Sequence, residues 1–316
     1  MRLGFVLPQA GPLASPDTLI RAAQRAEALG YDSLWVLERL LYPIEPRTPY
    51  APRADGKMPE EFRRVFDPLE ALTFVAAHTS RIALGTSVLD MPFHNPLILA
   101  RQLATLDVLS RGRLRVGLGQ GWSEDEFEAT GASFKDRGRR ADEFIQVLKA
   151  VWTTDPVAFD GEFFRIPRSV VDPKPVQRPH PPIYLAAFAP GSLARVGRLA
   201  DGWNPVAIPA DAMGRMMDEI RAAARAAGRD PNGLELIVRA NLELTQAPLG
   251  DGRGIFSGSL EEIEQDIRAV RAIGATEIFF DPIYSADSRS EEGFLGHLER
   301  IPRIVQRATG RLARTA

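Results

Sequence analysis

The pattern of apolar and polar positions predicts a regular alternation of strands and helices along the chain. Short apolar runs, which are typical of buried strands, occupy residues 3–7, 33–37, 82–88, 114–118, 183–187, 203–206, 234–242 and 277–281. Three of the amphipathic stretches between them begin with a capping residue followed by proline, at Ser15-Pro16, Asp67-Pro68 and Asn95-Pro96. This pair of residues is typical of helix N-termini. Further helices are predicted around 192–200, 210–228, 259–273 and 290–308.

This alternation also predicts how the strands pair. Strands that alternate with helices pair in parallel through right-handed crossovers. About eight strand-helix units in a chain of 316 residues favour a closed (β/α)8 TIM barrel over an open doubly wound sheet. We therefore expect an α/β fold in which residues 1–316 form a single TIM-barrel domain, with the functional site at the C-terminal ends of the strands.

Two segments are too long to be ordinary connections. The first, at about 40–66, follows the second predicted strand and is rich in proline and arginine. The second, at about 119–182, follows the fourth strand and contains two helical stretches. It also contains Asp160-Gly161 between aromatic residues, which predicts a tight hairpin. In a barrel both insertions would cover the C-terminal mouth, so we expect them to form a lid over the site.

Composition and charge narrow the class of protein. The chain has 45% hydrophobic and 25% charged residues, 39 Lys and Arg against 41 Asp and Glu, and a net charge of -2. This balance argues against nucleic acid or a membrane surface as a partner, and no apolar run approaches the roughly 20 residues that span a bilayer. The N-terminus predicts a strand and not a signal peptide. We expect a cytoplasmic protein that binds a small molecule, and homo-oligomer formation stays open.

The absence of cysteine excludes several kinds of chemistry. With 0 Cys, the chain can hold no disulfide, iron–sulfur cluster or thiolate zinc site, and it has no cysteine nucleophile. Its 4 histidines show no metal-ligand spacing. No GxSxG motif is present, so a serine hydrolase has little support. We therefore expect no metal site.

Two loops after predicted strands are candidates for cofactor binding. Gly117-Leu118-Gly119-Gln120-Gly121-Trp122 has the spacing GxGxG, which fits neither the dinucleotide motif nor the P-loop. Its glycines fit equally well a close approach to a cofactor or a tight turn that needs positive φ, and Trp122 either walls a flat ring or packs in the core. Phe188-Ala189-Pro190-Gly191-Ser192 precedes a helix whose free N–H groups would suit an anion, although an ordinary serine cap explains it too.

Charged residues near these loops complete the candidate site. Glu38-Arg39 follow the second predicted strand, where barrels place catalytic groups. They predict either proton transfer by Glu38 with anion binding by Arg39, or an ion pair that braces the lid. Arg195 and Arg198 either help to hold an anionic tail or form a solvated helix face.

Several segments together resemble a known family. Residues 85–96 (GTSVLDMPFHNP), 100–107 (ARQLATLD), 110–122 (SRGRLRVGLGQGW) and 199–203 (LADGW) are similar in order and spacing to the luciferase-like monooxygenase superfamily. The resemblance spans most of the chain and implies the same (β/α)8 barrel. It is strongest to the oxidoreductases that depend on the deazaflavin coenzyme F420, and FMN-dependent monooxygenases are close relatives of these.

The resemblance assigns roles to residues of this chain. It implies that the cofactor ring lies against Thr86, Ser87 and Val88, with a non-proline cis peptide between Ser87 and Val88. It implies further contacts from Gly119, Gln120, Gly121 and Trp122, and a phosphate held by Gly191 and Ser192. The Asp-His pair and the glutamate of some deazaflavin-linked sugar-phosphate dehydrogenases are replaced here by Glu38-Arg39 and Trp122, so their acid/base mechanism does not transfer.

The resemblance is compatible with three functions. The first is an F420-dependent oxidoreductase that transfers a hydride between the deazaflavin and an unknown small organic substrate. The second is an FMN-dependent monooxygenase that uses reduced flavin and O2. The third is a flavin-binding barrel without catalytic activity. The histidines used by bacterial luciferases and alkanesulfonate monooxygenases have no counterpart that we can match in this chain.

Overall fold

Eight parallel strands form a closed barrel, as the alternation predicts. The computed structural model describes residues 1–53 and 55–310. Its barrel strands are β1 (Arg2–Val6), β2 (Ser33–Val36), β3 (Ala83–Thr86), β5 (Leu114–Gly119), β8 (Ile183–Leu185), β9 (Gly202–Trp203), β10 (Glu235–Asn241) and β13 (Glu277–Asp281). Each pairs in parallel with the next, and β13 pairs with β1 to close the ring.

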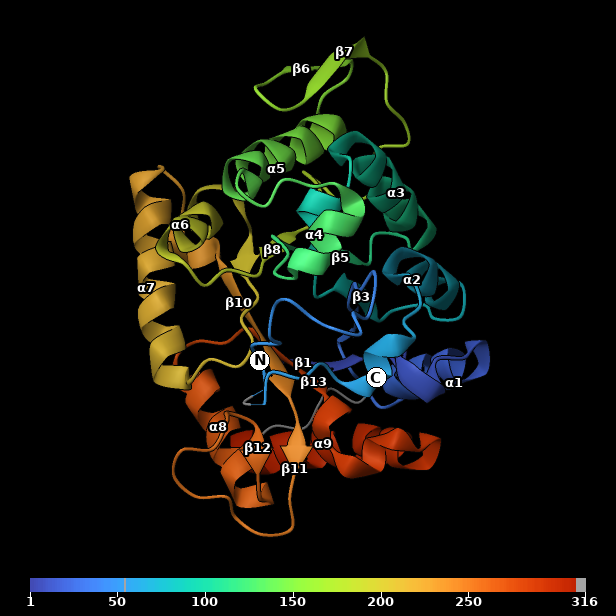
Figure 1. The fold of residues 1–316 in the computed structure, drawn as a ribbon, viewed down its shortest axis with the longest axis vertical. Helices are drawn as coiled ribbons and strands as arrows, with labels where there is room; N and C mark the ends of the chain where they lie inside the picture. The colour runs from blue at the N-terminus through green and yellow to red at the C-terminus, as the bar shows by residue number, and fades with distance from the viewer. Residues whose placement is uncertain (54, 311–316) are drawn as a thin grey trace.

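A helix follows each barrel strand and covers the outside of the barrel (Figure 1). In chain order these are α1 (Pro16–Ala28), α2 (Pro68–Ala76), α3 (Pro96–Leu109), α5 (Arg137–Thr153), α6 (Pro190–Leu199), α7 (Ala210–Ala226), α8 (Leu260–Ala272) and α9 (Glu291–Thr309). The predicted caps are present, since the side chains of Ser15, Asp67 and Asn95 each accept a hydrogen bond from an N–H of the first turn. The local signals at these helix starts therefore agree with the tertiary fold.

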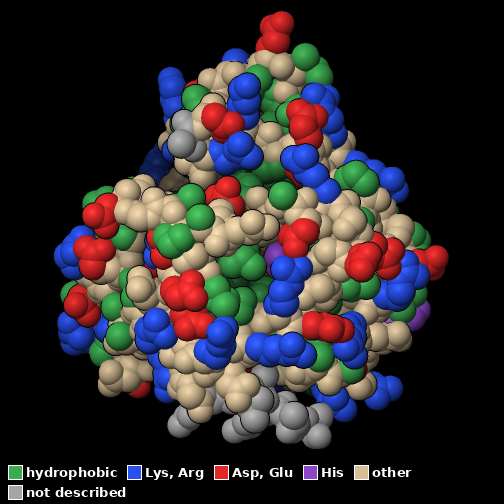
Figure 2. All heavy atoms as spheres, turned by 90° about the horizontal axis from the view of Figure 1, so that it is seen from below, with side chains coloured by type: hydrophobic (Ala, Val, Ile, Leu, Met, Phe, Trp, Pro, Cys, Tyr) green, Lys and Arg blue, Asp and Glu red, His purple; other side chains and the backbone are tan. Residues whose placement is uncertain are grey.

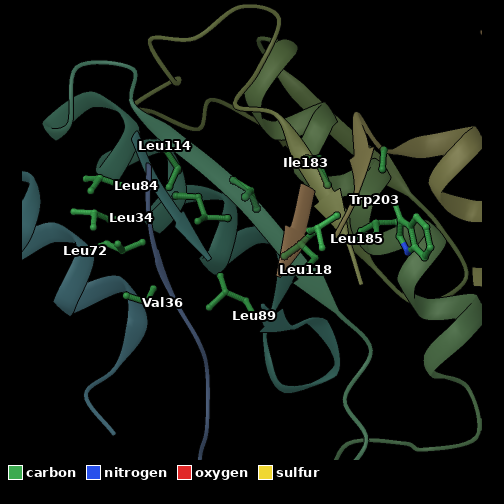
Figure 3. Packing of buried hydrophobic residues seen from close by; sticks show 14 of the residues in the cluster. Leu34, Val36, Leu72, Leu84, Leu89, Leu114, Leu118, Ile183, Leu185 and Trp203 are labelled. Carbon is green, nitrogen blue, oxygen red and sulfur yellow. The ribbon is translucent and has the colours of Figure 1, made fainter. Parts of the chain in front are cut away.

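The main core lies between the strands and the surrounding helices. Outward side chains of successive strands, such as Leu34, Leu84 and Leu118, are at most 1% exposed and pack in one layer (Figure 3). Inside the barrel, Trp35 stacks on Phe279 with ring centroids 4.7 Å apart. The barrel is thus filled below its mouth, and a cavity remains at the C-terminal end.

The two predicted insertions contain four further elements. The first carries the short helix η2 (Glu60–Arg63), and the second carries α4 (Glu124–Thr130) and the antiparallel hairpin of β6 (Val157–Asp160) and β7 (Arg165–Ser169). This hairpin confirms the prediction from Asp160-Gly161, and it projects beyond the helices (Figure 1). The short elements elsewhere are β4 (Leu89–Asp90), β11 (Glu243–Leu244), β12 (Ser257–Gly258), η1 (Gly11–Leu13), η3 (Met91–Phe93), η4 (Pro231–Gly233), η5 (Pro282–Tyr284) and η6 (Ala286–Arg289).

The surface mixes charges of both signs. On the face in Figure 2, basic and acidic side chains are interspersed around a central hollow where hydrophobic side chains gather. This distribution agrees with the net charge of -2. Among the described residues, none of the helices combines the length and hydrophobicity needed to cross a membrane.

Candidate active site

A cavity of about 460 Å³ lies at the C-terminal ends of the barrel strands. Its size is within the range of pockets that bind cofactors and small ligands. Residues that end or follow β2, β3, β5, β8, β9 and β10 line it together with the first insertion. From the predicted set, the lining includes Glu38, Arg39, Ser87, Val88, Gly119, Gln120, Gly121, Trp122 and Ser192.

Thr86 and Gly191 lie just outside the described lining of this cavity. Thr86 is fully buried, and its hydroxyl donates to the Gly117 carbonyl and accepts from the Gly117 N–H at 2.8 and 2.9 Å. Its side chain therefore joins β3 to β5. Gly191 lies in the first turn of α6 next to Ser192, and a Cβ added to Gly191 would meet none of the described atoms within 4 Å.

Ser87 and Val88 form one wall of the cavity directly after β3. The peptide bond between them is cis, as the resemblance implies. The Ser87 N–H donates to the Val36 carbonyl at 2.7 Å, and the Val88 carbonyl accepts from the Glu38 N–H at 3.2 Å. The ends of β2 and β3 are thereby joined at the cavity.

The glycine loop is shaped mainly by contacts within the protein. A Cβ on Gly119 would lie 2.5 Å from Val88 Cγ2 and from Asp90 Oδ1, so a side chain there would require these neighbours to move. Gly121 has a φ of +67°, which favours glycine. The positive φ of Gly121 fits the interpretation as a tight turn, and the crowding at Gly119 comes from protein side chains. The Gln120 side chain donates to the Arg137 carbonyl at 3.3 Å.

The Glu38 carboxylate contacts Asp90 and His94, and it does not pair with Arg39, its neighbour in sequence. Its Oε2 accepts from the Asp90 N–H at 2.7 Å, and its Oε1 lies 2.8 Å from Nε2 of His94. Burial on its own would lower the pKa of His94, but the hydrogen bond and negative charge of Glu38 outweigh it and raise that pKa. The carboxyl of Glu38 is 3% exposed and lines the cavity, so it connects the cavity to a partly exposed, protonatable ring.

Arg39 braces the lid, and its partner is Glu126 of α4. The Arg39 guanidinium lies 2.8 Å from the Glu126 carboxylate, which also accepts from the Leu40 N–H at 2.9 Å. Arg39 packs over the Trp122 ring at 5.0 Å from its centroid. Its Nε is buried and has no hydrogen-bond partner among the described residues. The predicted ion pair therefore exists, but with α4 in place of Glu38.

Trp122 forms part of an aromatic wall. Its ring lies 5.6 Å from that of Tyr50, whose ring meets Phe62 edge-on at 6.0 Å. Tyr50 and Phe62 come from the first insertion, and all three rings line the cavity. This wall gives the side of the cavity under the lid an apolar character suited to a flat organic ring.

Asp90 is a site residue that the sequence patterns do not single out. It is 6% exposed, lines the cavity and accepts from the Gly121 N–H at 2.9 Å. Burial and, next, the negative charge of Glu38 raise its pKa to about 7. A carboxyl with this pKa is suited to give or take a proton near neutral pH. Asp90 lies inside the segment 85–96, but its pairing with Glu38 depends on the folded barrel.

The start of α6 faces the same cavity through Ser192. The Ser192 hydroxyl donates to the Ala189 carbonyl at 2.7 Å and accepts from the Phe188 N–H at 3.2 Å. As the residue after Pro190, Gly191 carries the first N–H of the helix, and such N–H groups lack an intrahelical acceptor. This helix start can therefore hold an anion.

Arg195 does not lie on a solvated helix face, whereas Arg198 does, as one of the two interpretations predicts. Arg195 is 7% exposed, pairs with Asp142 of α5 and donates to the Gly138 carbonyl at 2.6 Å. Arg198 lies 2.8 Å from the same Asp142. These arginines join α6 to α5, because a shared carboxylate between the two helices satisfies their charge. Arg137 at the start of α5 lines the cavity, as do Arg39 and Arg239.

The fold is a (β/α)8 barrel, and its mouth holds a cavity, a carboxyl with a raised pKa and a helix N-terminus. This arrangement is typical of enzymes with this fold. The luciferase-like monooxygenase family model matches residues 1–248, and the chain belongs to this family.

The names of two relatives mention different cofactors, F420 in one and FMNH(2) in the other. The F420-dependent glucose-6-phosphate dehydrogenase of Amycolatopsis mediterranei is 35% identical over 194 residues, which are 60% of this chain and 53% of that protein. The FMNH(2)-dependent dimethylsulfone monooxygenase of Pseudomonas putida is 34% identical over 155 residues, or 48% and 42% of the two chains. These two relatives are thus named as a dehydrogenase and a monooxygenase.

A solved structure agrees with this fold. The F420-dependent secondary alcohol dehydrogenase in complex with an F420-acetone adduct has a TM-score of 0.76 with this chain at 20% identity. The match covers 96% of this chain and 98% of the other. At this identity the likeness concerns the fold.

Proposed function

We propose that this chain is an oxidoreductase that transfers a hydride between the deazaflavin coenzyme F420 and a small organic substrate. The observation that carries this proposal is one cavity shared by the Ser87-Val88 segment, the glycine loop, the start of α6 and the carboxyl of Asp90. F420-dependent proteins among the relatives and among the similar folds support the choice of cofactor.

The residues present fit a cofactor with a flat ring and a phosphate. Ser87, Val88 and Gly119 would hold the ring, because they form a wall with little side-chain bulk at the end of β3 and β5. Gly191 and Ser192 would hold the phosphate at the positive end of the α6 dipole. When bound, the deazaflavin supplies a carbon centre that accepts or donates a hydride as an electron pair.

Side chains of this protein would transfer the proton and limit the access of water to the cavity. Asp90 holds a proton over part of the neutral range, so it can protonate a substrate oxygen or take a proton from it. Glu38 and His94 connect this region to the outside through a contact of 2.8 Å. The first insertion and α4, joined by Arg39 and Glu126, cover the cavity and limit the access of water.

An FMN-dependent monooxygenase is the second candidate function. It is favoured by the similarity to the FMNH(2)-dependent dimethylsulfone monooxygenase. Both cofactors have a tricyclic ring and a phosphate, so the same walls of the cavity would serve either. The two functions differ in the reaction of the bound cofactor, since reduced FMN would activate O2 and the deazaflavin would exchange a hydride with the substrate.

Titration of the purified protein with each cofactor, followed by fluorescence quenching, tests the proposal. We expect submicromolar binding of F420 and hydride exchange with a member of a panel of small alcohols, aldehydes and ketones. Asp90→Asn serves as the comparison, because it should keep binding and lose turnover. Binding of FMN alone with oxygen consumption would favour the monooxygenase, and binding without turnover of any substrate would favour a barrel without catalysis.

A further inference from the structure

We infer that Arg239 and Asn204 are positioning residues that hold Ser87 and Val88 across the barrel mouth in the geometry that supports the cofactor ring. This inference rests on the proposed function, because it assigns these residues a task in the same cavity. Arg239, Asn204 and Ser87 all line that cavity. None of the motifs found in the sequence includes Arg239 or Asn204.

Arg239 binds the backbone of Ser87 directly. Its Nη1 donates to the Ser87 carbonyl at 2.9 Å, Nη2 donates to Asp281 at 2.5 Å, and Nε donates to Asn241 at 3.1 Å. The side chain is 13% exposed and that of Asp281 is 5% exposed. All three nitrogen atoms of the guanidinium are therefore bonded, and the group has one orientation.

Asn204 binds the side chain of the same serine. Its Nδ2 donates to the Ile237 carbonyl at 2.8 Å, which leaves its Oδ1 to accept from the Ser87 hydroxyl at 2.7 Å. Asn204 is 2% exposed. Both polar groups of the amide are thus occupied, so Ser87 is held at its carbonyl by one residue and at its hydroxyl by another.

These two contacts cross the barrel, and the sheet cannot replace them. In the closed order of eight strands, β10, which carries Arg239, lies four strands from β3 in either direction. Asn204 follows β9, the strand next to β10. Strand pairing fixes only neighbours, so the position of Ser87 over the mouth depends on side chains that reach from the opposite wall.

The contribution of Arg239 is geometric more than electrostatic. Its charge is paired with the buried carboxylate of Asp281, so little net field reaches the cavity. What remains is the planar fork of the guanidinium, which holds a carbonyl, a carboxylate and an amide oxygen at once. Lysine keeps the charge but cannot reproduce this fork. Arg239→Lys therefore separates position from charge.

Arg115→Lys is the matched control. Arg115 also carries a guanidinium inside the barrel, 15% exposed, and it pairs with the fully buried Glu277, which bonds to Ser33 behind Trp35, away from the cavity. We expect Arg239→Lys to weaken F420 binding by about ten-fold or more, as for loss of a charged hydrogen bond. Arg115→Lys should leave the Kd within about two-fold, even where both variants lower Tm equally.

A double-mutant cycle tests Asn204 independently of the folding of the arginine variant. If Asn204 acts through Ser87, the variants S87A and N204A should each weaken cofactor binding, and the double variant should bind no more weakly than the worse single variant. Strict additivity of the two effects would overturn the assignment for Asn204.

The outcomes distinguish this inference from the proposed function. Wild-type protein that binds F420, with Arg239→Lys binding it within about two-fold of wild type, would overturn the role of Arg239 and leave the proposed function intact. Wild-type protein that binds neither F420 nor FMN would overturn both. Equal losses of affinity in Arg239→Lys and Arg115→Lys would show a general effect of stability and would also overturn the inference.

Discussion

Asp90→Asn should remove a titration from the buried wall of the cavity. Asp90 has a pKa of about 7 because it is buried and, secondly, because it lies beside Glu38. Asparagine has nearly the same shape and keeps an oxygen that can accept from the Gly121 N–H, the bond that Asp90 makes at 2.9 Å. The variant therefore changes the protonation of this position more than its packing.

The size of the effect depends on the difference between folded and unfolded chains. In the unfolded chain Asp90 has its ordinary pKa of 3.8, and in the folded chain about 7. Between these values the folded chain binds one proton more, so the free energy of unfolding falls by about 1.36 kcal/mol for each pH unit as pH rises. The difference of about three pH units amounts to about 4 kcal/mol.

Urea unfolding at a series of pH values measures this difference. Wild type and Asp90→Asn should have similar free energies of unfolding at about pH 3 and below, where Asp90 is mostly protonated in both states. The variant should become the more stable protein as pH rises, by up to about 4 kcal/mol above pH 7. Glu45→Gln is the control, because it removes one exposed carboxylate and should shift stability by less than about 0.5 kcal/mol throughout.

Activity provides a second measurement on the same variant. If Asp90 transfers the proton, kcat should fall by about 10² to 10⁴, and the change in kcat/KM near pH 7 should disappear. Stability curves of wild type and variant that run parallel from pH 4 to 9 would refute the buried titration. A variant with wild-type turnover and an unchanged pH profile would refute the role in proton transfer.

Three further predictions concern the lid, the glycine loop and the start of α6. Arg47→Ala removes contacts of 3.1 and 3.2 Å to α4. It should speed proteolysis of the first insertion with little effect on overall stability, as for an exposed ion pair; unchanged cleavage would contradict the bracing role. Gly119→Ala should destabilise the protein by about 1–3 kcal/mol in urea, because its Cβ would lie 2.5 Å from Val88. Gly191→Val meets open space and should keep its Tm, yet weaken cofactor binding measured by fluorescence quenching. Wild-type affinity would refute the phosphate site.

Much of the site could be predicted because the C-terminal ends of parallel strands converge. Glu38, Val88 and Trp122 stand out by their positions after predicted strands, and the barrel brings them to one cavity. The partners of these residues could not be predicted. Arg39 pairs with Glu126 of α4, 87 positions away in the sequence. Arg195 pairs with Asp142 of α5. Both partners depend on how the helices pack.

The sequence by itself determined the order of strands and helices, and hence the barrel. Apolar runs, the caps at Ser15, Asp67 and Asn95, and glycine and proline at helix ends are local signals, and right-handed crossovers leave few ways to arrange them. Only the tertiary structure decided how the mouth is held together. Ser87 meets Asn204 and Arg239 across 117 and 152 positions, and Asp90 acquires its pKa from burial beside Glu38. Such contacts depend on closure of the barrel, which places opposite walls within reach of one side chain, and no local pattern carries that information.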